Sequence, residues 1–140
     1  MGTYRNFAQQ ALTAYLTGKT IKALLVKSTY VYDEDTHVYL SDITATGTEV
    51  AAGGYSRQTL SGVSVSYSAA TGVFITAADI NFGTFTQAGV LGPIFYVDTG
   101  TPSTSELLCG DVEGSPVDLT NAVSSIYRID PAQGFLIARL

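Results

Sequence analysis

The residue types with the most potential for chemistry are concentrated in one acidic segment, residues 33–37, which reads DEDTH. Carboxylate oxygens and an imidazole nitrogen are common ligands of divalent metal ions, so Asp33, Asp35 and His37 could together form a metal site. The spacing argues against it, because an EF-hand loop needs a glycine and a bidentate glutamate at fixed positions, and His37 has no second histidine nearby. We therefore expect a solvated loop that binds no metal and no cofactor.

His37 is also the only histidine, so general-base catalysis by a histidine would have to use it. No Ser, Cys or Asp is spaced so as to single out a partner, although the members of a Ser-His-Asp triad can lie far apart in sequence. Cys109 is the only cysteine, which excludes an intrachain disulfide, and its apolar surroundings are typical of a buried strand residue. We predict that the protein is not an enzyme, and a small hydrolase that uses His37 is an alternative.

The composition argues against two classes of partner. The chain has 140 residues and a net charge of -5, and its seven basic residues are scattered, whereas binding to a nucleic-acid backbone needs a cluster of Lys and Arg. No apolar run is long enough to span a bilayer, so we expect no membrane association. Only 14% of the residues are charged, against roughly 25% in an average globular domain. The surface is therefore expected to be rich in Ser, Thr and Gly, or to be buried partly against partner proteins.

Two apolar stretches, residues 94–97 and 107–109, indicate the centre of the fold. They flank the segment DTGTPSTS, in which Asp98, Gly100 and Pro102 each favour a turn. This arrangement predicts two adjacent antiparallel strands. The first stretch is apolar at every position rather than at alternate ones, which predicts a central strand that is covered on both faces.

The remaining strands are predicted from short apolar or alternating runs separated by turn residues. They are an apolar strand at 21–28, a hairpin at 59–77, a strand at 79–85, a short edge strand at 117–119, and a hairpin at 125–140 around a turn at 130–134, with loops at 45–56 and 87–92. Thr36 is expected to cap a short helical turn that reaches Leu40. The whole pattern predicts an all-β fold over residues 19–140, either an antiparallel sandwich or a small barrel, and we favour the two-sheet β-sandwich.

One amphipathic helix is predicted at the N-terminus, over about residues 3–17. Its apolar residues recur at helical spacing and form one stripe: Tyr4, Phe7, Ala8, Ala11, Leu12, Tyr15 and Leu16. The helix could close one end of the domain's own core. It could also be a docking arm, made of residues 1–18, whose aromatic stripe packs against another subunit.

Aromatic residues are more numerous than one small core needs, with nine tyrosines and six phenylalanines. Aromatic side chains are frequent anchors of protein–protein interfaces, because each buries a large area with few rotatable bonds. We therefore predict that part of the helical stripe and the tyrosines of segment 30–39 contact a second copy of the chain or another protein. The candidate interface residues are Tyr4, Phe7, Leu12, Tyr15, Leu16, Tyr30, Tyr32 and Tyr39.

Four motifs, taken in order, give the chain a resemblance to a known class of proteins. They are KALLVKSTYVYDEDTH near the start, AAGGY in a loop, SYSAATGVFITAADINF in a hairpin, and IFYVDTGTPSTSELLCGDVE. Together they resemble small structural proteins encoded among the virion genes of tailed bacteriophages, and the similar segments run over about residues 21–140. The N-terminal helix lies outside them. The resemblance implies a β-rich virion component, such as a capsid decoration or cement protein, and it supplies no catalytic residues.

The first functional hypothesis is therefore a non-enzymatic structural protein of the virion. On this hypothesis the chain forms a homodimer or homotrimer and binds neighbouring subunits of the major capsid protein, so that many modest contacts stabilise the shell. The alternative is a recognition module associated with a tail or fibre, which binds a host surface glycan or protein through loops 44–55 and 87–92. The hypotheses differ in residues 1–18, because only the first needs them for contacts within the shell.

Overall fold

The computed structural model describes residues 4–138, and the side chains of residues 4–135. Its elements are α1 (Arg5–Leu16), β1 (Thr20–Lys27), α2 (Leu40–Ala45), β2 (Gln58–Thr59), β3 (Ser64–Ser68), β4 (Gly72–Thr76), β5 (Ile80–Asn81), β6 (Val90–Asp98), the 3-10 turn η1 (Pro102–Thr104), β7 (Leu107–Gly110), β8 (Ile126–Tyr127) and β9 (Phe135–Ala138). The described strands form three sheets, ordered β2-β1-β6-β7, β3-β4-β9 and β5-β8, and every pair is antiparallel. The prediction of a β-rich antiparallel fold is confirmed, whereas the two-sheet sandwich is not.

The centre of the fold is the pair β1–β6, which runs from Thr20 opposite Asp98 to Lys27 opposite Val90. Strand β7 continues the sheet on the far side of β6, as the two apolar stretches predict. Side chains of β1 alternate between two separate cores, with Ile21, Ala23 and Leu25 in one and Leu24 and Val26 in the other. Because both faces of β1 and β6 are covered, these strands are apolar at consecutive positions, and the prediction of a central strand covered on both faces is confirmed.

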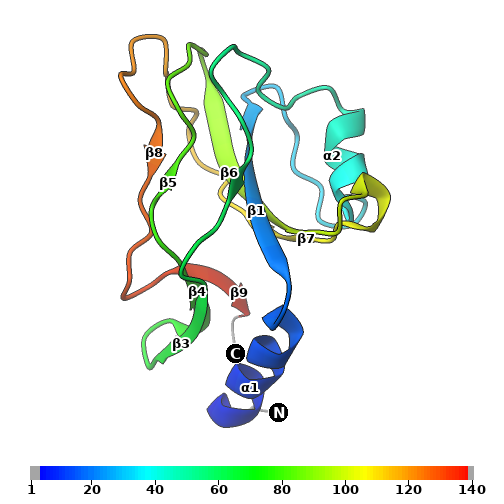
Figure 1. Cartoon of the computed structure of the whole chain (residues 1–140), viewed down its shortest axis with the longest axis vertical. Helices are drawn as coiled ribbons and strands as arrows, with labels where there is room; N and C mark the ends of the chain where they lie inside the picture. The colour runs from blue at the N-terminus through cyan, green and yellow to red at the C-terminus, as the bar shows by residue number, and fades with distance from the viewer. Residues whose placement is uncertain (1–3, 139–140) are drawn as a thin grey trace.

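The larger core lies on the face of the central sheet that is covered by β4, β9, the β5-β8 pair and the end of α1 (Figure 1). Within it, the rings of Phe95 from β6 and Phe135 from β9 stack, with centroids 4.1 Å apart and an interplanar angle of 8°. Its other buried residues are Leu16, Ile21, Ala23, Leu25, Val50, Leu60, Ile75, Ile80, Phe82, Phe85, Val90 and Ile129. Helix α1, near the start of the chain, and strand β9, near its end, therefore pack into the same apolar cluster.

The second core lies on the opposite face, where α2 and the loop at 28–39 cover the sheet (Figure 1). Leu40 and Ile43 stand one helical turn apart and both point into it, which gives this short helix a buried face. The remaining members come from β1, β6 and two loops: Leu24, Val26, Tyr30, Ile94, Tyr96 and Val112.

Helix α2 begins later than the sequence predicts. The Asp42 carboxylate oxygen Oδ2 accepts hydrogen bonds from the backbone N–H groups of Val38, at 3.0 Å, and Tyr39, at 2.8 Å. An acidic residue in the first turn also interacts favourably with the helix dipole. The prediction that Thr36 caps this helix is therefore wrong, because Asp42 binds the free amides just before the first turn.

The hairpin predicted at 59–77 is confirmed only in its inner part, where β3 pairs with β4. Thr59, at the outer end of the predicted hairpin, and Gln58 just before it pair instead with β1, and the Leu60 N–H donates to the Ile21 carbonyl at 2.9 Å. Gly62, with φ of +64°, then lets the chain turn away toward the second sheet. The segment at 58–76 thus contributes β2 to the central sheet and β3 and β4 to the second one.

The hairpin predicted at 125–140 is wrong as a pairing over residues 125–138, because β8 pairs with β5 and β9 pairs with β4, and its last two residues lie outside the described ones. The turn itself forms, since the Gly134 N–H donates to the Asp130 carbonyl at 2.6 Å. Asp79, just before β5, accepts a hydrogen bond from the Ile129 N–H at 2.9 Å. This contact holds the segment that follows β8 beside β5. Strand β9, after the turn, therefore leads away from β8 toward β4 (Figure 1).

Strand β6 starts within the loop predicted at 87–92, because Val90 pairs with both β1 and Val117. The backbone groups of Val90 and Val117 exchange hydrogen bonds of 2.8 and 2.9 Å. The edge strand predicted at 117–119 is therefore an isolated bridge rather than a strand.

Candidate functional site

The acidic segment at 33–37 forms a self-capped turn. Oδ1 of Asp33 accepts hydrogen bonds from the backbone N–H groups of Asp35, at 3.0 Å, and Thr36, at 3.1 Å. Hydrogen bonds from Thr36, and then from the Asp35 amide, hold the pKa of Asp33 below its ordinary value. Among the side chains that the structure describes, no three His, Cys, Asp or Glu residues gather as metal ligands. His37 is half-buried, and its Nδ1 lies 2.8 Å from the hydroxyl of Tyr30.

A cavity of about 330 Å³ opens between this loop and β7. Its inner wall, which we call the floor, is made of buried or half-buried apolar residues: Tyr30, Ile43, Ile94, Leu107 and Val112. Its outer edge, which we call the mouth, carries polar side chains: Tyr32, Glu34, His37 and Glu113. The acidic segment at 33–37 indicates Glu34 and His37 from the sequence alone. Glu113 belongs to a loop far away in the sequence, and no pattern there connects it with them.

Cys109 is half-buried in β7, where its side chain packs against the larger core, and burial raises the pKa of its thiol to about 12. Because the thiolate is the reactive form, we expect native Cys109 to react with an aromatic disulfide reagent at pH 8 at least about 100-fold more slowly than free cysteine does. Unfolding in guanidinium should restore the rate of free cysteine. Absorbance at the wavelength of the released thiolate follows both reactions. A native rate close to that of the unfolded chain would contradict the buried environment.

Helix α1 is confirmed, but its apolar stripe is split between two flanks. Leu12 and Leu16 pack against the larger core, and α1 contacts β3 and β4. Gln9 joins this inner flank, where its side-chain amide donates to the carbonyl of Val65 at 3.4 Å. On the outer flank, Tyr4 is 86% exposed and Phe7 is 69% exposed. The helix therefore packs on its own domain and still presents aromatic side chains outward.

Tyr15 fixes the end of α1 to the start of β7. Its hydroxyl donates to Oε2 of Glu106 at 2.6 Å, and Nζ of Lys19 lies 3.4 Å from the centroid of its ring. The hydrogen bond to Glu106, together with burial, raises the pKa of Tyr15 to about 12. Tyr15 is thus engaged within its own chain, and nothing in the sequence signals Glu106 as its partner.

The three tyrosines predicted as contacts in segment 30–39 have different environments. Tyr30 is buried in the second core, so its side chain does not fit the predicted contact with another subunit. The same holds for Leu16 of α1, which is buried in the larger core. Tyr32 is 45% exposed at the mouth of the cavity. Tyr39 is 37% exposed, and its backbone forms a bridge with Glu106.

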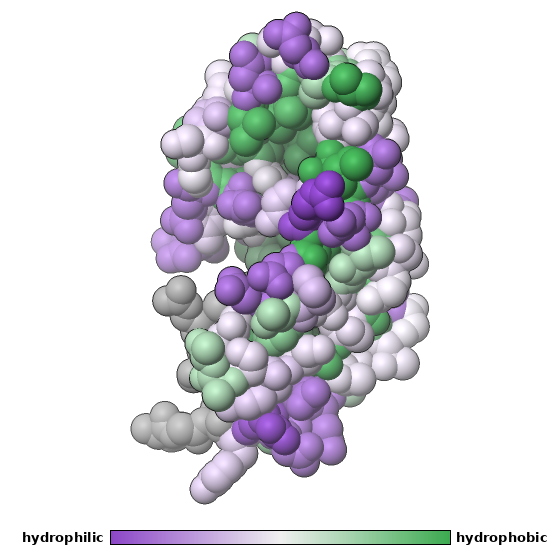
Figure 2. Space-filling view, turned by 90° about the vertical axis from the view of Figure 1, so that its left-hand side faces the viewer, coloured by the Kyte–Doolittle hydropathy of each residue, from purple (hydrophilic) through white to green (hydrophobic). Residues whose placement is uncertain are grey.

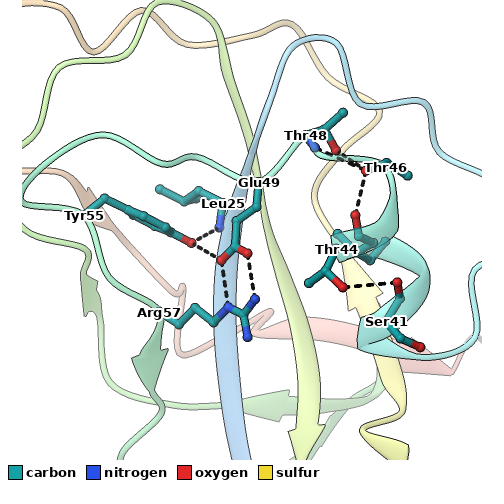
Figure 3. Close-up of polar contacts among 9 residues, drawn as sticks. Leu25, Ser41, Thr44, Thr46, Thr48, Glu49, Tyr55 and Arg57 are labelled. Atoms are coloured by element: carbon teal, nitrogen blue, oxygen red, sulfur yellow. Dashed lines mark hydrogen bonds and ion pairs between the residues drawn. The ribbon is translucent and has the colours of Figure 1, made fainter. Parts of the chain in front are cut away.

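The loop at 44–55, which a recognition module would use, is fastened to the edge of β1 (Figure 3). The Arg57 guanidinium donates to both carboxylate oxygens of Glu49, each at 2.7 Å, in a bidentate pair. The hydroxyl of Tyr55 donates to the same carboxylate at 3.2 Å and accepts from the Leu25 N–H at 3.0 Å. On the α2 side of this loop, the hydroxyls of Thr46 and Thr48 lie 2.6 Å apart (Figure 3). The sequence gives no sign of this network.

A second, smaller cavity of about 190 Å³ lies between β6 and the segment at 117–127. On that side of the molecule, the face of β5 and β8, hydrophobic side chains gather around a hollow (Figure 2). The cavity is lined largely by apolar residues, among them Val90, Leu119 and Ile126. Ser125 also lines it, and its buried hydroxyl has no hydrogen-bond partner among the residues that the structure describes.

Neither of the two α-helices within residues 4–138 has the length and hydropathy that crossing a bilayer requires. The resemblance of residues 21–140 to virion proteins of tailed phages stays a prediction. Searches against protein-family models, curated proteins and solved structures found no match to this chain.

Proposed function

We propose that this protein is a non-enzymatic structural component of a phage virion, which self-associates and binds neighbouring subunits of the capsid shell. The observation that supports this proposal is the outer flank of α1, where Tyr4 and Phe7 are exposed while the opposite flank is packed. Adjacent exposed aromatic side chains on one helix flank are typical of protein interfaces rather than of free surface.

The outer flank of α1 is complementary to itself. Its first half carries the bulky Tyr4 and Phe7, and its second half carries the small, exposed Ala11 and Ala14. Two copies that pair antiparallel about a two-fold axis would place each Phe7 against the alanines of the other copy. The helix contains no acidic residue and only Arg5 as a base, so charge repulsion opposes this pairing little. These features favour a homodimer over a homotrimer.

Binding to the shell would use the rest of the surface in many weak copies. Only 14% of the residues are charged, which limits the desolvation cost of covering broad areas. Once one chain of a dimer has bound a shell subunit, the other chain is held close to the neighbouring subunit. The second contact therefore forms at a high effective concentration. Because the protein binds the assembled shell and not the separated subunits, it stabilises the shell by mass action.

The double variant Tyr4→Ser/Phe7→Ser tests the self-association. We expect light scattering to give twice the chain mass for the wild type and a single chain mass for the variant. The fold of each chain should be retained, because replacing an exposed side chain changes the free energy of unfolding by no more than about 0.5 kcal/mol. Circular dichroism checks this. Val123→Ser is the matched control, since Val123 is 87% exposed in a loop outside α1 and its variant should remain dimeric. A wild type that stays monomeric at high concentration contradicts the dimer.

Co-sedimentation tests the binding to the shell. Shells assembled from the major capsid protein of the same phage should pellet the wild type, and should pellet the monomeric variant less because the avidity is lost. Adhesion to host cells without binding to shells would instead favour the recognition module.

A further inference from the structure

We propose that the cavity between the loop at 30–37 and β7 binds a short extended segment of another protein, with an aliphatic side chain in the floor and an Arg or Lys side chain at the mouth. The inference rests on the proposed function only for the source of that segment, a subunit of the shell.

The floor suits an aliphatic side chain. Ile43, Ile94 and Val112 are buried members of the second core and line the cavity, so its inner wall is continuous with packed apolar structure. A volume of about 330 Å³ exceeds what one leucine side chain fills and leaves room for adjoining backbone. Because Ile43, Ile94 and Val112 are 7% exposed or less, an aliphatic group gains mainly by covering the half-buried Leu107 beside them and removing its apolar surface from water.

The mouth is negative. Glu34 and Glu113 stand there on separate segments, and none of the described residues that line the cavity is a Lys or Arg. Within the described side chains, neither glutamate takes part in an ion pair. The Tyr32 hydroxyl lies 3.4 Å from Oε2 of Glu34. Burial, and then the charges of Glu34, Glu113 and Asp35, raise the pKa of Tyr32, so the negative potential of both segments reaches the same hydroxyl.

This combination selects a basic residue beside an aliphatic one. A guanidinium or ammonium group at the mouth would be attracted by two carboxylates that lack a cation of their own, and the Tyr32 ring adds a surface on which such a group can lie. Solvent-exposed ion pairs are individually weak. A single segment would therefore bind only weakly, and the site would act through the many copies on a shell.

The inference is tested by titrating the full-length protein with short peptides while NMR monitors the chemical shifts of its backbone amides. The probe is Ac-Leu-Arg-NH2, and its controls are Ac-Leu-citrulline-NH2, which removes only the charge, and Ac-Ser-Arg-NH2, which removes the aliphatic group. We expect the amides of residues 107–113 to shift, with at least roughly threefold tighter binding of the probe than of either control. Equal affinity for the citrulline peptide, or shifts confined to other regions, overturns the inference.

Variants of the protein supply the reciprocal test. Glu34→Gln/Glu113→Gln keeps the size of both side chains and should weaken binding of the probe roughly threefold to tenfold. Asp118→Asn is the control, because Asp118 does not line the cavity and its variant should bind like the wild type. If the double variant still binds shells as the wild type does, the inference fails and the proposed function stands. If the wild type binds the probe but no shell, the proposed function fails and the site stands.

Discussion

A Phe95→Ala variant is expected to lose about 4 kcal/mol of unfolding free energy. Phe95 is only 1% exposed in the central strand β6. Its ring stacks on Phe135 at 4.1 Å and meets the ring of Tyr127 edge-on at 6.4 Å. Truncation removes these contacts and leaves a cavity that the surrounding sheets cannot close, because β1, β6 and β7 are held by their ladders.

Urea denaturation followed by circular dichroism measures this loss, with equal slopes required for a valid comparison. Val123→Ala is the control, because it also truncates an apolar side chain, one that is 87% exposed and lies outside α1 and outside both cavities. Its stability should change by less than about 0.5 kcal/mol. Since small domains are stable by about 5–15 kcal/mol, Phe95→Ala should leave a fold near its limit at 37 °C. A loss below about 1.5 kcal/mol would falsify the packing described for the larger core.

The second large effect is expected at Gly54, where replacement with alanine should cost about 3 kcal/mol. Gly54 has φ of +93°, and a Cβ atom there would overlap the carbonyl oxygen of Thr84. Gly83 faces it with φ of +96°, and a Cβ on Gly83 would lie 2.5 Å from the carbonyl oxygen of Gly54. The backbones of two loops therefore touch directly, and neither can move without displacing Tyr55 or Phe82 beside it.

Gly53→Ala is the control for this prediction, since it makes the same chemical change one residue earlier. A Cβ atom on Gly53 would meet nothing within 4 Å, and its φ is not in the left-handed region. Its stability should be unchanged or slightly higher, because alanine restricts the unfolded chain. Thermal melts of the two variants under identical conditions give the comparison. Matching midpoints for Gly53→Ala and Gly54→Ala would rule out the close contact.

Local patterns in the sequence were sufficient for the elements that carry their own signal. The run at 94–97 predicts a strand covered on both faces because burial on both faces removes polar positions, and α1 is predicted because its apolar residues recur at helical spacing. The partners of β2, β8 and β9 were not predictable in this way. Their pairing depends on contacts between residues far apart in sequence, such as Asp79 with Ile129.

The candidate site shows the same division. The acidic segment at 33–37 drew attention to the loop that forms the cavity, but Glu113 joins Glu34 only because β7 returns beside that loop. Helix α2 has six residues, too few for a reliable periodicity, and its signal is Asp42 rather than the predicted Thr36. For α1, the spacing identifies the apolar residues but not which flank is packed, since that depends on where β3 and β4 lie.

The pairing of β1 with β6 has a consequence for how the chain folds as it is synthesised. Thr20 pairs with Asp98, so the two residues of this pair are nearly 80 residues apart along the chain. At translation rates of 5–20 residues per second, β1 waits roughly 4–16 s for its partner, as an apolar strand with open edges. Such non-local contacts also slow folding, because the entropy of closing a long loop is lost before the contacts form. Synthesis of this protein therefore exposes β1 to association with other nascent chains until β6 has emerged from the ribosome.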